Sequence, residues 1–394
     1  MSQTEVQLIK NGAVVDADIN GMSSSKLSGA LPAISGASLT NLPSTDKATN
    51  LIINGAMQIQ QRTAGNYTTT TNGYTGIDRY HVFANPASKL TYEPSTDSPV
   101  GFSNSFKITS TSAYTPVSGN YHYFGQRVEG HNWEHLEYGT SNAKTITISF
   151  FVKSSITGTW SGIVKNHAQD RSYPWEYTIS SANTWEKKTI TVPGCPDGTW
   201  NTGTSPSAWI YFCIGSSASG TNYLGSANSW QNTNLIGTTG SNSLPNTNGA
   251  TWYMTGLKVE EGSSATDFVH RLFGEELKLC ERYYQVLAKG NGKYFAGTAC
   301  NYQSNQVFLP VTFKTEMRAA PTVIFSEGSG YYQLYDSGNT SGINFNRPSS
   351  FEYKNTLGGS FYVGSTYISG VTAGNASLWY ASNASSLLAF DSEL

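Results

Sequence analysis

Apolar and polar residues alternate along most of the chain after residue 50, and this period of two predicts β-strands. The clearest strands are expected at residues 146–152, 185–192, 209–214 and 252–259. Residues 209–214 are apolar at every position, so this strand should be buried on both faces. The polar stretch 215–249 should be a long loop. Because no helical pattern separates the strands, residues 51–272 predict a β-sandwich or a jelly roll.

A single helix is expected after the jelly roll, over residues 273–290, where it would connect two β regions. Glu275 and Glu276 place acidic groups in its first turn, where the helix dipole favours them. Apolar residues at helical spacing then form one face: Leu277, Cys280, Tyr284 and Leu287. Residues 291–394 return to β patterning and predict a smaller C-terminal β-sandwich. Its strands are expected near residues 307–313, 322–325, 331–335 and 361–363.

Residues 1–50 have a different pattern. Units of one apolar residue and one turn residue, such as Leu27-Ser28-Gly29, recur every seven to eight residues. One copy of such a strip cannot bury its apolar row, so we expect an extended stalk that packs against other subunits or anchors to a partner. A flexible Ser/Gly linker is the alternative. The residues expected to make the anchoring and oligomer contacts are Ile19, Leu27, Leu31, Ile34, Leu39 and Leu42.

The composition is poor in charge and rich in aromatic rings. Only 13% of residues are charged and the net charge is −2, against 24 Tyr, 17 Phe and 9 Trp. So many rings exclude a disordered chain, and the lack of a basic surplus argues against nucleic-acid binding. Without an apolar run of about 18 residues, no membrane insertion is expected. The start of the chain lacks the basic and apolar regions of a signal peptide, so we expect synthesis in the cytoplasm without ordinary secretion.

Few residues suggest metal or redox chemistry. His131 and His135 lie four residues apart, which on a helix would let both bind zinc, but Glu134 is adjacent to the second histidine rather than following the first. We therefore expect surface histidines, with no metal and no cofactor. The four cysteines are expected to be reduced, although a disulfide between Cys195 and Cys213 stays open. Asp78-Arg79 is interpreted as a partly buried structural pair.

Catalysis would need two carboxylates that face each other across a glycan. The candidates are Glu129, Glu134, Glu137, Asp170, Glu176 and Glu186. Acidic residues are sparse, and no repeat period of a parallel β-helix is visible. We therefore expect a protein that is not an enzyme.

Aromatic side chains are the main candidates for binding. A sugar ring stacks its apolar face on Trp or Tyr, while Asn, Ser and Thr bind its hydroxyls. The alternative for each ring is a place in the core. In the pair Tyr331-Tyr332, neighbouring strand residues point to opposite faces, so one ring should be exposed. The candidate glycan-binding residues are Tyr331, Tyr332, Tyr335, Tyr362, Tyr367, Trp379, Trp133 and Trp175, and further platforms are Tyr121, Tyr123, Trp160, Trp200, Trp230 and Tyr380.

Several segments of the chain resemble segments of phage tail fibres and receptor-binding proteins, especially those of short-tailed and cyanophage-like viruses. The resemblance lies both in the segments and in their order along the chain. Residues 50–62 are similar to the opening strand of their jelly roll. Residues 147–154 resemble a strand that they share with carbohydrate-binding jelly rolls. Residues 78–80 are similar to the next recognisable motif of these proteins, and residues 259–268 to the segment that closes their jelly roll. Residues 276–284 resemble their helix motif, and residues 317–322 resemble the start of their C-terminal sandwich.

The resemblance implies a structural virion protein. It would be a homotrimer, with its N-terminus bound to a tail adaptor or nozzle protein and its C-terminal sandwich facing the host. Its expected role is non-enzymatic attachment of the virion to a host surface glycan, with lipopolysaccharide as the expected glycan. Three chains per fibre would supply avidity. Two alternatives stay open, a glycan depolymerase tailspike and a purely structural tail component.

Overall fold

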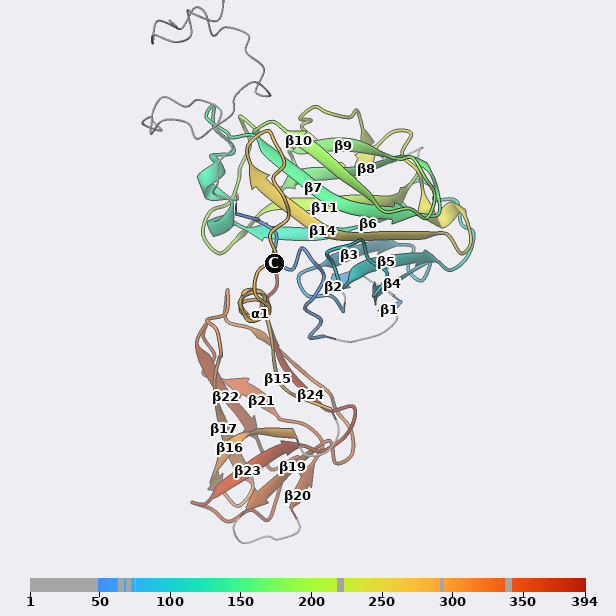
Figure 1. Ribbon diagram of the computed structural model, residues 1–394. Coiled ribbons are helices and arrows are strands. Elements are labelled where there is room, and N and C mark those ends of the chain that lie inside the picture. The colour runs from blue at the N-terminus through green and yellow to red at the C-terminus, as the bar shows by residue number, and fades with distance from the viewer. Residues whose placement is uncertain are drawn as a thin grey trace, which may run out of the picture. The chain divides into compact units, whose positions relative to one another are not determined.

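Two antiparallel six-stranded sheets pack face to face in the first part of the computed structural model (Figure 1). The structure describes residues 49–62, 67–68, 72–74, 76–217, 223–290, 294–336 and 342–394. The anchoring residues predicted between Ile19 and Leu42 lie outside these ranges. The fold is mostly β, as the alternation predicted.

The first sheet has the strand order β1-β4-β5-β14-β7-β10. Its strands are β1 (Tyr67–Thr68), β4 (Leu90–Ser95), β5 (Ser105–Ser110), β14 (Thr251–Glu261), β7 (Ile146–Ser154) and β10 (Glu186–Val192). The second sheet has the order β2-β3-β6-β11-β8-β9. Its strands are β2 (Gly73–Tyr74), β3 (His81–Asn85), β6 (Tyr121–Glu129), β11 (Pro206–Ser216), β8 (Gly158–Asn166) and β9 (Ser172–Ile179). Each strand predicted from the alternation in this region is present. Residues 50–62, expected from the resemblance to be the opening strand, form bends and turns instead.

Alternate residues of both sheets fill the core between them. Phe212 of β11 packs against Phe124 of the neighbouring strand and, across the core, against Phe150 of the first sheet, with ring centroids 5.6 and 4.9 Å apart. Trp175 lies over Gly162, where a Cβ atom would come within 2.2 Å of the indole. A side chain larger than hydrogen at position 162 would therefore displace this ring.

Short elements lie in the connections of the jelly roll. Two 3₁₀ turns, η5 (Gly130–Asn132) and η6 (Glu134–Leu136), follow β6. The predicted loop at 215–249 contains β12 (Leu224–Gly225), β13 (Gly237–Thr238) and the 3₁₀ turn η7 (Leu244–Asn246). Strands β12 and β13 pair with each other in parallel. This loop therefore folds back on itself.

The predicted helix is shorter than expected. Helix α1 spans Phe273–Glu281, and β15 (Tyr284–Lys289) replaces the second half of the prediction. Strand β15 pairs with β24 (Leu387–Asp391), about 100 residues further along the chain. Tyr284 is opposite Asp391 in this pairing, and a local apolar spacing that suits a helix cannot reveal so distant a partner. No helix among the described residues is long and apolar enough to cross a membrane.

The C-terminal region forms a second, smaller sandwich. Its three-stranded sheet has the order β15-β24-β18, with β18 at Thr322–Phe325. Its seven-stranded sheet has the order β20-β19-β23-β16-β17-β22-β21. These strands are β20 (Ile343–Phe345), β19 (Tyr332–Asp336), β23 (Ala376–Ala381), β16 (Tyr294–Gln303), β17 (Gln306–Thr312), β22 (Gly358–Val363) and β21 (Ser350–Glu352). The buried Trp379 contacts Phe345 and Phe361, at ring distances of 5.0 and 5.9 Å.

Charged residues near the end of the chain pair with the jelly roll. The guanidinium of Arg79 is buried, pairs with Glu393 and lies 3.5 Å from the ring centre of Tyr283. Arg62 binds Asp391 at 2.8 Å and Glu393 at 3.0 Å. These contacts join residues far apart in the sequence into one buried charge network.

Asp78 and Arg79 do not pair with each other, contrary to the sequence interpretation. The Asp78 carboxylate accepts hydrogen bonds from the backbone and side-chain nitrogens of Gln61, at 2.9 and 2.6 Å. Burial raises the pKa of Asp78 to about 6, despite these hydrogen bonds. The opposite charges of these adjacent residues predicted an ion pair between them, whereas Arg79 pairs with Glu393.

Candidate functional site

The outer face of the second sheet carries a row of aromatic side chains on its central strands. Strands β3, β6 and β11 alternate, so that one set of residues enters the core and the other faces outward. The outward aromatic residues are Phe83, Tyr121, Tyr123, Trp209 and Tyr211. The segment that contains β12 and β13 covers part of this face, since Leu235 and Ile236 pack against these rings.

Strand register places two cations on either side of Trp209. Arg127 of β6 and Lys165 of β8 lie directly opposite Trp209 of β11 in the two pairings. The Arg127 guanidinium is 4.3 Å from the ring centre and the Lys165 ammonium is 4.7 Å from it. Trp209 is almost fully buried, so both cations contact a ring in a largely desolvated place.

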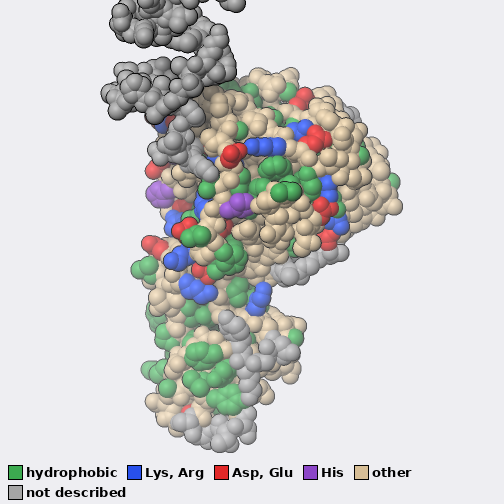
Figure 2. All heavy atoms as spheres, in the orientation of Figure 1, with side chains coloured by type: hydrophobic (Ala, Val, Ile, Leu, Met, Phe, Trp, Pro, Cys, Tyr) green, Lys and Arg blue, Asp and Glu red, His purple; other side chains and the backbone are tan. Residues whose placement is uncertain are grey.

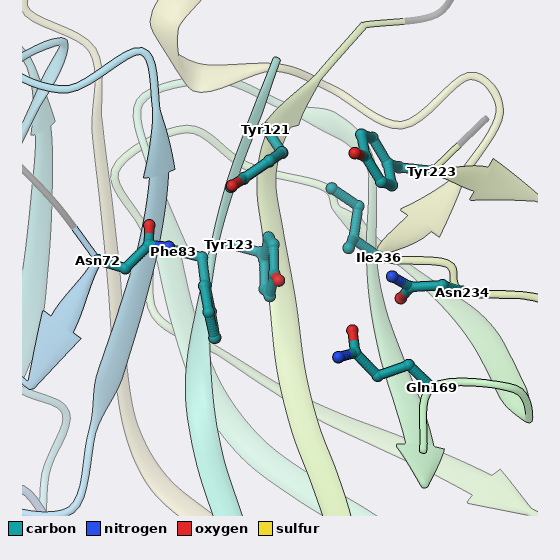
Figure 3. Close-up of a pocket in the computed structure, with 8 residues that line it drawn as sticks. All are labelled: Asn72, Phe83, Tyr121, Tyr123, Gln169, Tyr223, Asn234 and Ile236. Carbon is teal, nitrogen blue, oxygen red and sulfur yellow. The ribbon is translucent and has the colours of Figure 1, made fainter. Parts of the chain in front are cut away.

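A pocket opens beside this row, with a volume of about 180 Å³ (Figure 3). It is lined by Asn72, Phe83, Tyr121, Tyr123, Gln169, Tyr223, Asn234 and Ile236. Phe83 and Tyr123 are stacked, with centroids 4.6 Å apart. Tyr121 and Tyr223 meet edge to face at 5.6 Å. The volume is below the ~300–1,000 Å³ of sites that enclose a drug-sized ligand, so the pocket suits one ring of a larger molecule.

Lys165 lies beneath the polar side of the pocket. Its ammonium donates hydrogen bonds to the side-chain oxygens of Gln169 at 3.2 Å and Asn234 at 2.9 Å. Burial, together with the nearby Arg127, lowers the pKa of Lys165 to about 7. Lys165 is therefore a buried group that gains or loses its charge near neutral pH.

The pocket combines apolar faces with neutral hydrogen-bonding groups. Tyr121 and Tyr223 are each partly exposed, so their rings can be reached from solvent. The amides of Asn72, Gln169 and Asn234 add donors and acceptors around them. Such a set of groups can hold a ring that has apolar C–H faces and polar edges.

Four of the predicted glycan-binding residues are buried in the two cores. Trp133 and Trp175 lie in the core of the jelly roll, and Tyr332 and Trp379 lie in that of the C-terminal sandwich, each at most 1% exposed. A ring without an accessible face cannot stack on a sugar, so their burial does not fit the predicted platform. Trp160 is buried in the same way.

The other predicted tyrosines of the C-terminal sandwich are half-buried. Tyr335 packs edge to face with Tyr380 at 5.6 Å, and Tyr362 packs against Phe308 at 5.1 Å, on the outer face of the seven-stranded sheet. Tyr331 packs against the core. The Tyr367 hydroxyl accepts hydrogen bonds from Arg347 at 2.8 and 2.6 Å. Tyr335 and Tyr362 lie on different strands of this sheet, β19 and β22.

The outer face of the seven-stranded sheet is nevertheless apolar. Figure 2 shows hydrophobic side chains gathered on the C-terminal sandwich. The exposed large apolar residues on strands β16 and β23 are Phe295, Tyr302 and Leu378. These residues add exposed apolar surface to the C-terminal sandwich.

The histidine and carboxylate candidates lie in different surroundings. His131 and Glu134 lie in exposed 3₁₀ turns, 3.8 Å apart. Glu129 is buried, and hydrogen bonds from Arg282 and Tyr283 outweigh the effect of burial and hold its pKa below the usual range. Among the described residues, no group of three potential ligands could hold a metal ion. Cys195 and Cys213 are both buried and free, so the structure shows no disulfide between them.

Sequence reasoning proposed Tyr121 and Tyr123 as a platform but missed the rest of the pocket. Gln169 lies in the turn between β8 and β9, and Tyr223 and Asn234 lie in the loop that was interpreted as a connection. A useful signal was present in residues 209–214, where a strand buried on both faces requires a cover for its outer aromatic residues. The loop that follows this strand supplies that cover.

The comparisons with known proteins give similar folds at low identity. No family model matches the sequence, and no curated protein matches it. Among solved structures, the enzymatically active domain of tailspike protein 4 from bacteriophage CBA120 is 15% identical, with a TM-score of 0.29 over 54% of this chain and 21% of that chain. This chain therefore spans about a fifth of the tailspike structure.

Two other similar structures come from bacteria. A putative sugar-binding protein from Bacteroides thetaiotaomicron is 12% identical, with a TM-score of 0.32 over 54% of this chain and 100% of that one. A family 11 carbohydrate-binding module from a cellulase of Clostridium thermocellum is 14% identical, with a TM-score of 0.24 over 52% of this chain and 99% of that one. Similarity at this level assigns no function, which has to be argued from the pocket itself.

Proposed function

We propose that this chain binds a cell-surface glycan in the pocket of the jelly roll, as the non-enzymatic attachment protein of a phage tail fibre. One observation carries the proposal: accessible tyrosine rings and neutral amides line the same small pocket. The fibre role rests on the sequence resemblance, which also implies the homotrimer, the tail partner at the N-terminus and a place in the virion.

The pocket residues match the two parts of a sugar surface. The C–H face of a pyranose would stack on Tyr121 or Tyr223, whose rings are fixed by their mutual edge-to-face contact. Ring hydroxyls would bind the amides of Gln169 and Asn234. Each site would be weak, and several copies on one virion would raise the overall affinity without new contacts.

Attachment without cleavage is supported by the residues that line the pocket. Glycoside hydrolysis ordinarily uses two carboxyl groups about 5–10 Å apart on either side of the scissile bond. None of the eight lining residues described above carries a carboxyl group. A depolymerase would therefore need a different site from the one proposed here.

The test uses the full-length protein and an immobilised panel of bacterial surface polysaccharides, including lipopolysaccharides. We expect saturable binding to some of them, and an unchanged chain length after long incubation with excess protein. Shortened polymer would instead support the depolymerase alternative. Failure to bind any surface polysaccharide would leave the purely structural role and would contradict the proposal.

A further inference from the structure

We infer that the pocket selects sugars that carry a carboxylate, because Lys165 turns the two pocket amides so that they present hydrogen-bond donors. This inference rests on the proposed glycan binding and names the class of sugar.

The amide orientations follow from the chemistry of lysine. An ammonium group can only donate hydrogen bonds, so the oxygens of Gln169 and Asn234 must face Lys165. The two NH₂ groups are then left on the sides away from the lysine. In Figure 3 the amide nitrogen of Gln169 points toward the aromatic rings and that of Asn234 points toward the cavity. The polar wall therefore offers donors, which suit the oxygens of a carboxylate.

Among the described residues, no acid pairs with Lys165. Its ammonium lies over the rings of Tyr123 on β6 and Trp209 on β11 and donates to the oxygens of Gln169 and Asn234, and Arg127 is near enough to lower its pKa. None of these groups is a carboxylate, and the described part of the covering loop, residues 223–249, contains no Asp or Glu. Asp170 is near Lys165 in the sequence, but its carboxylate accepts a hydrogen bond from the Asn166 side chain and pairs with Arg171.

A bound carboxylate would supply the missing negative charge. Two unit charges attract each other more strongly in a poorly hydrated place than in bulk water, and Lys165 is fully buried. Arg127 adds a second positive charge on the far side of Trp209. A neutral sugar would gain the stacking and the hydrogen bonds but not this attraction.

The same geometry makes binding depend on pH. Since the pKa of Lys165 is about 7, the ammonium is present below that pH and is lost above it. Burial and Arg127 also lower the pKa of His167, which is therefore neutral near pH 7. Binding of an acidic sugar should weaken between pH 6 and pH 8.5, whereas binding of a neutral sugar should change little.

The experiment uses the polysaccharide panel of the previous section, with each polymer in native form and in a form whose uronic acids are reduced to neutral sugars. We expect wild-type protein to bind native acidic polymers at least tenfold more tightly than their reduced forms at pH 6. The difference should shrink at pH 8.5. Equal binding of the native and reduced forms would overturn this inference and leave glycan binding intact, and no binding to any polymer would overturn both.

Two pocket variants, Asn234→Asp and Lys165→Met, and one control variant connect the effect to the pocket. Asn234→Asp replaces a donor with a carboxylate next to Lys165, and we expect it to lose at least tenfold in binding to native acidic polymer while keeping its fold. Asn355→Asp adds the same charge at an exposed turn of the C-terminal sandwich and should bind as wild type. Lys165→Met should bind native and reduced polymers alike. If Asn234→Asp binds acidic polymer as tightly as wild type, the inference is wrong.

Discussion

Replacing Glu393 with alanine is expected to lower the free energy of unfolding by about 3–5 kcal/mol, which is typical of breaking a buried ion pair. The substitution leaves Arg79, whose side chain is 1% exposed, without its carboxylate. It also removes one of the two acidic partners of Arg62, although Asp391 stays in place. Urea unfolding at neutral pH measures the loss directly.

Two control variants separate the buried pair from a general effect of losing an acid. Glu261→Ala removes the partner of Lys144 in an exposed pair and should cost less than about 1 kcal/mol. Glu393→Gln keeps an oxygen that can accept from Arg79, so its loss should lie between the two. A loss for Glu393→Ala as small as that for Glu261→Ala would show that Arg79 finds water or another partner.

Removing both accessible rings of the pocket, with Tyr121→Ala and Tyr223→Ala together, is expected to reduce glycan affinity by about 30-fold or more. Truncation of an aromatic anchor in a binding site commonly costs more than 1 kcal/mol, so that two rings cost about 2 kcal/mol or more. Because both side chains are only half-buried, the fold should persist. Titration of the bound polysaccharide with each protein gives the affinities.

The matched control removes two rings that the sequence analysis predicted to bind the glycan. Tyr335 and Tyr362 are also half-buried, but they lie on the seven-stranded sheet of the C-terminal sandwich. The double variant Tyr335→Ala and Tyr362→Ala should bind within twofold of wild type. The reverse result, with affinity lost only in this second variant, would place the site at the C-terminal tip.

Local alternation was sufficient to predict the fold class and many of the strands. The strand at 209–214 is an informative case, since its unbroken apolar run correctly predicted burial on both faces. The end of the helix could not be predicted in this way. Tyr284 and Leu287 continue the helical spacing, but β15 forms because its backbone pairs with a strand that lies about 100 residues further on.

The site was harder to predict because accessibility depends on which residues cover each ring. Trp133 and Tyr121 are both aromatic residues in the jelly roll, yet Trp133 packs against Tyr138 and Trp200 in the core, whereas Tyr121 faces outward. The contribution of Lys165 depends on three strands in register and on a loop that returns over the sheet. None of these relations is visible as a spacing along the chain.

The central claim is that glycan binds to the outer face of the second sheet, and hydrogen exchange with and without bound polysaccharide tests it most directly. The account predicts slower exchange at residues 121–125, 165–171 and 223–238, which surround the pocket. Exchange in β16 and β23 of the C-terminal sandwich should stay the same. Protection confined to those two strands, with the jelly roll unchanged, would contradict the account.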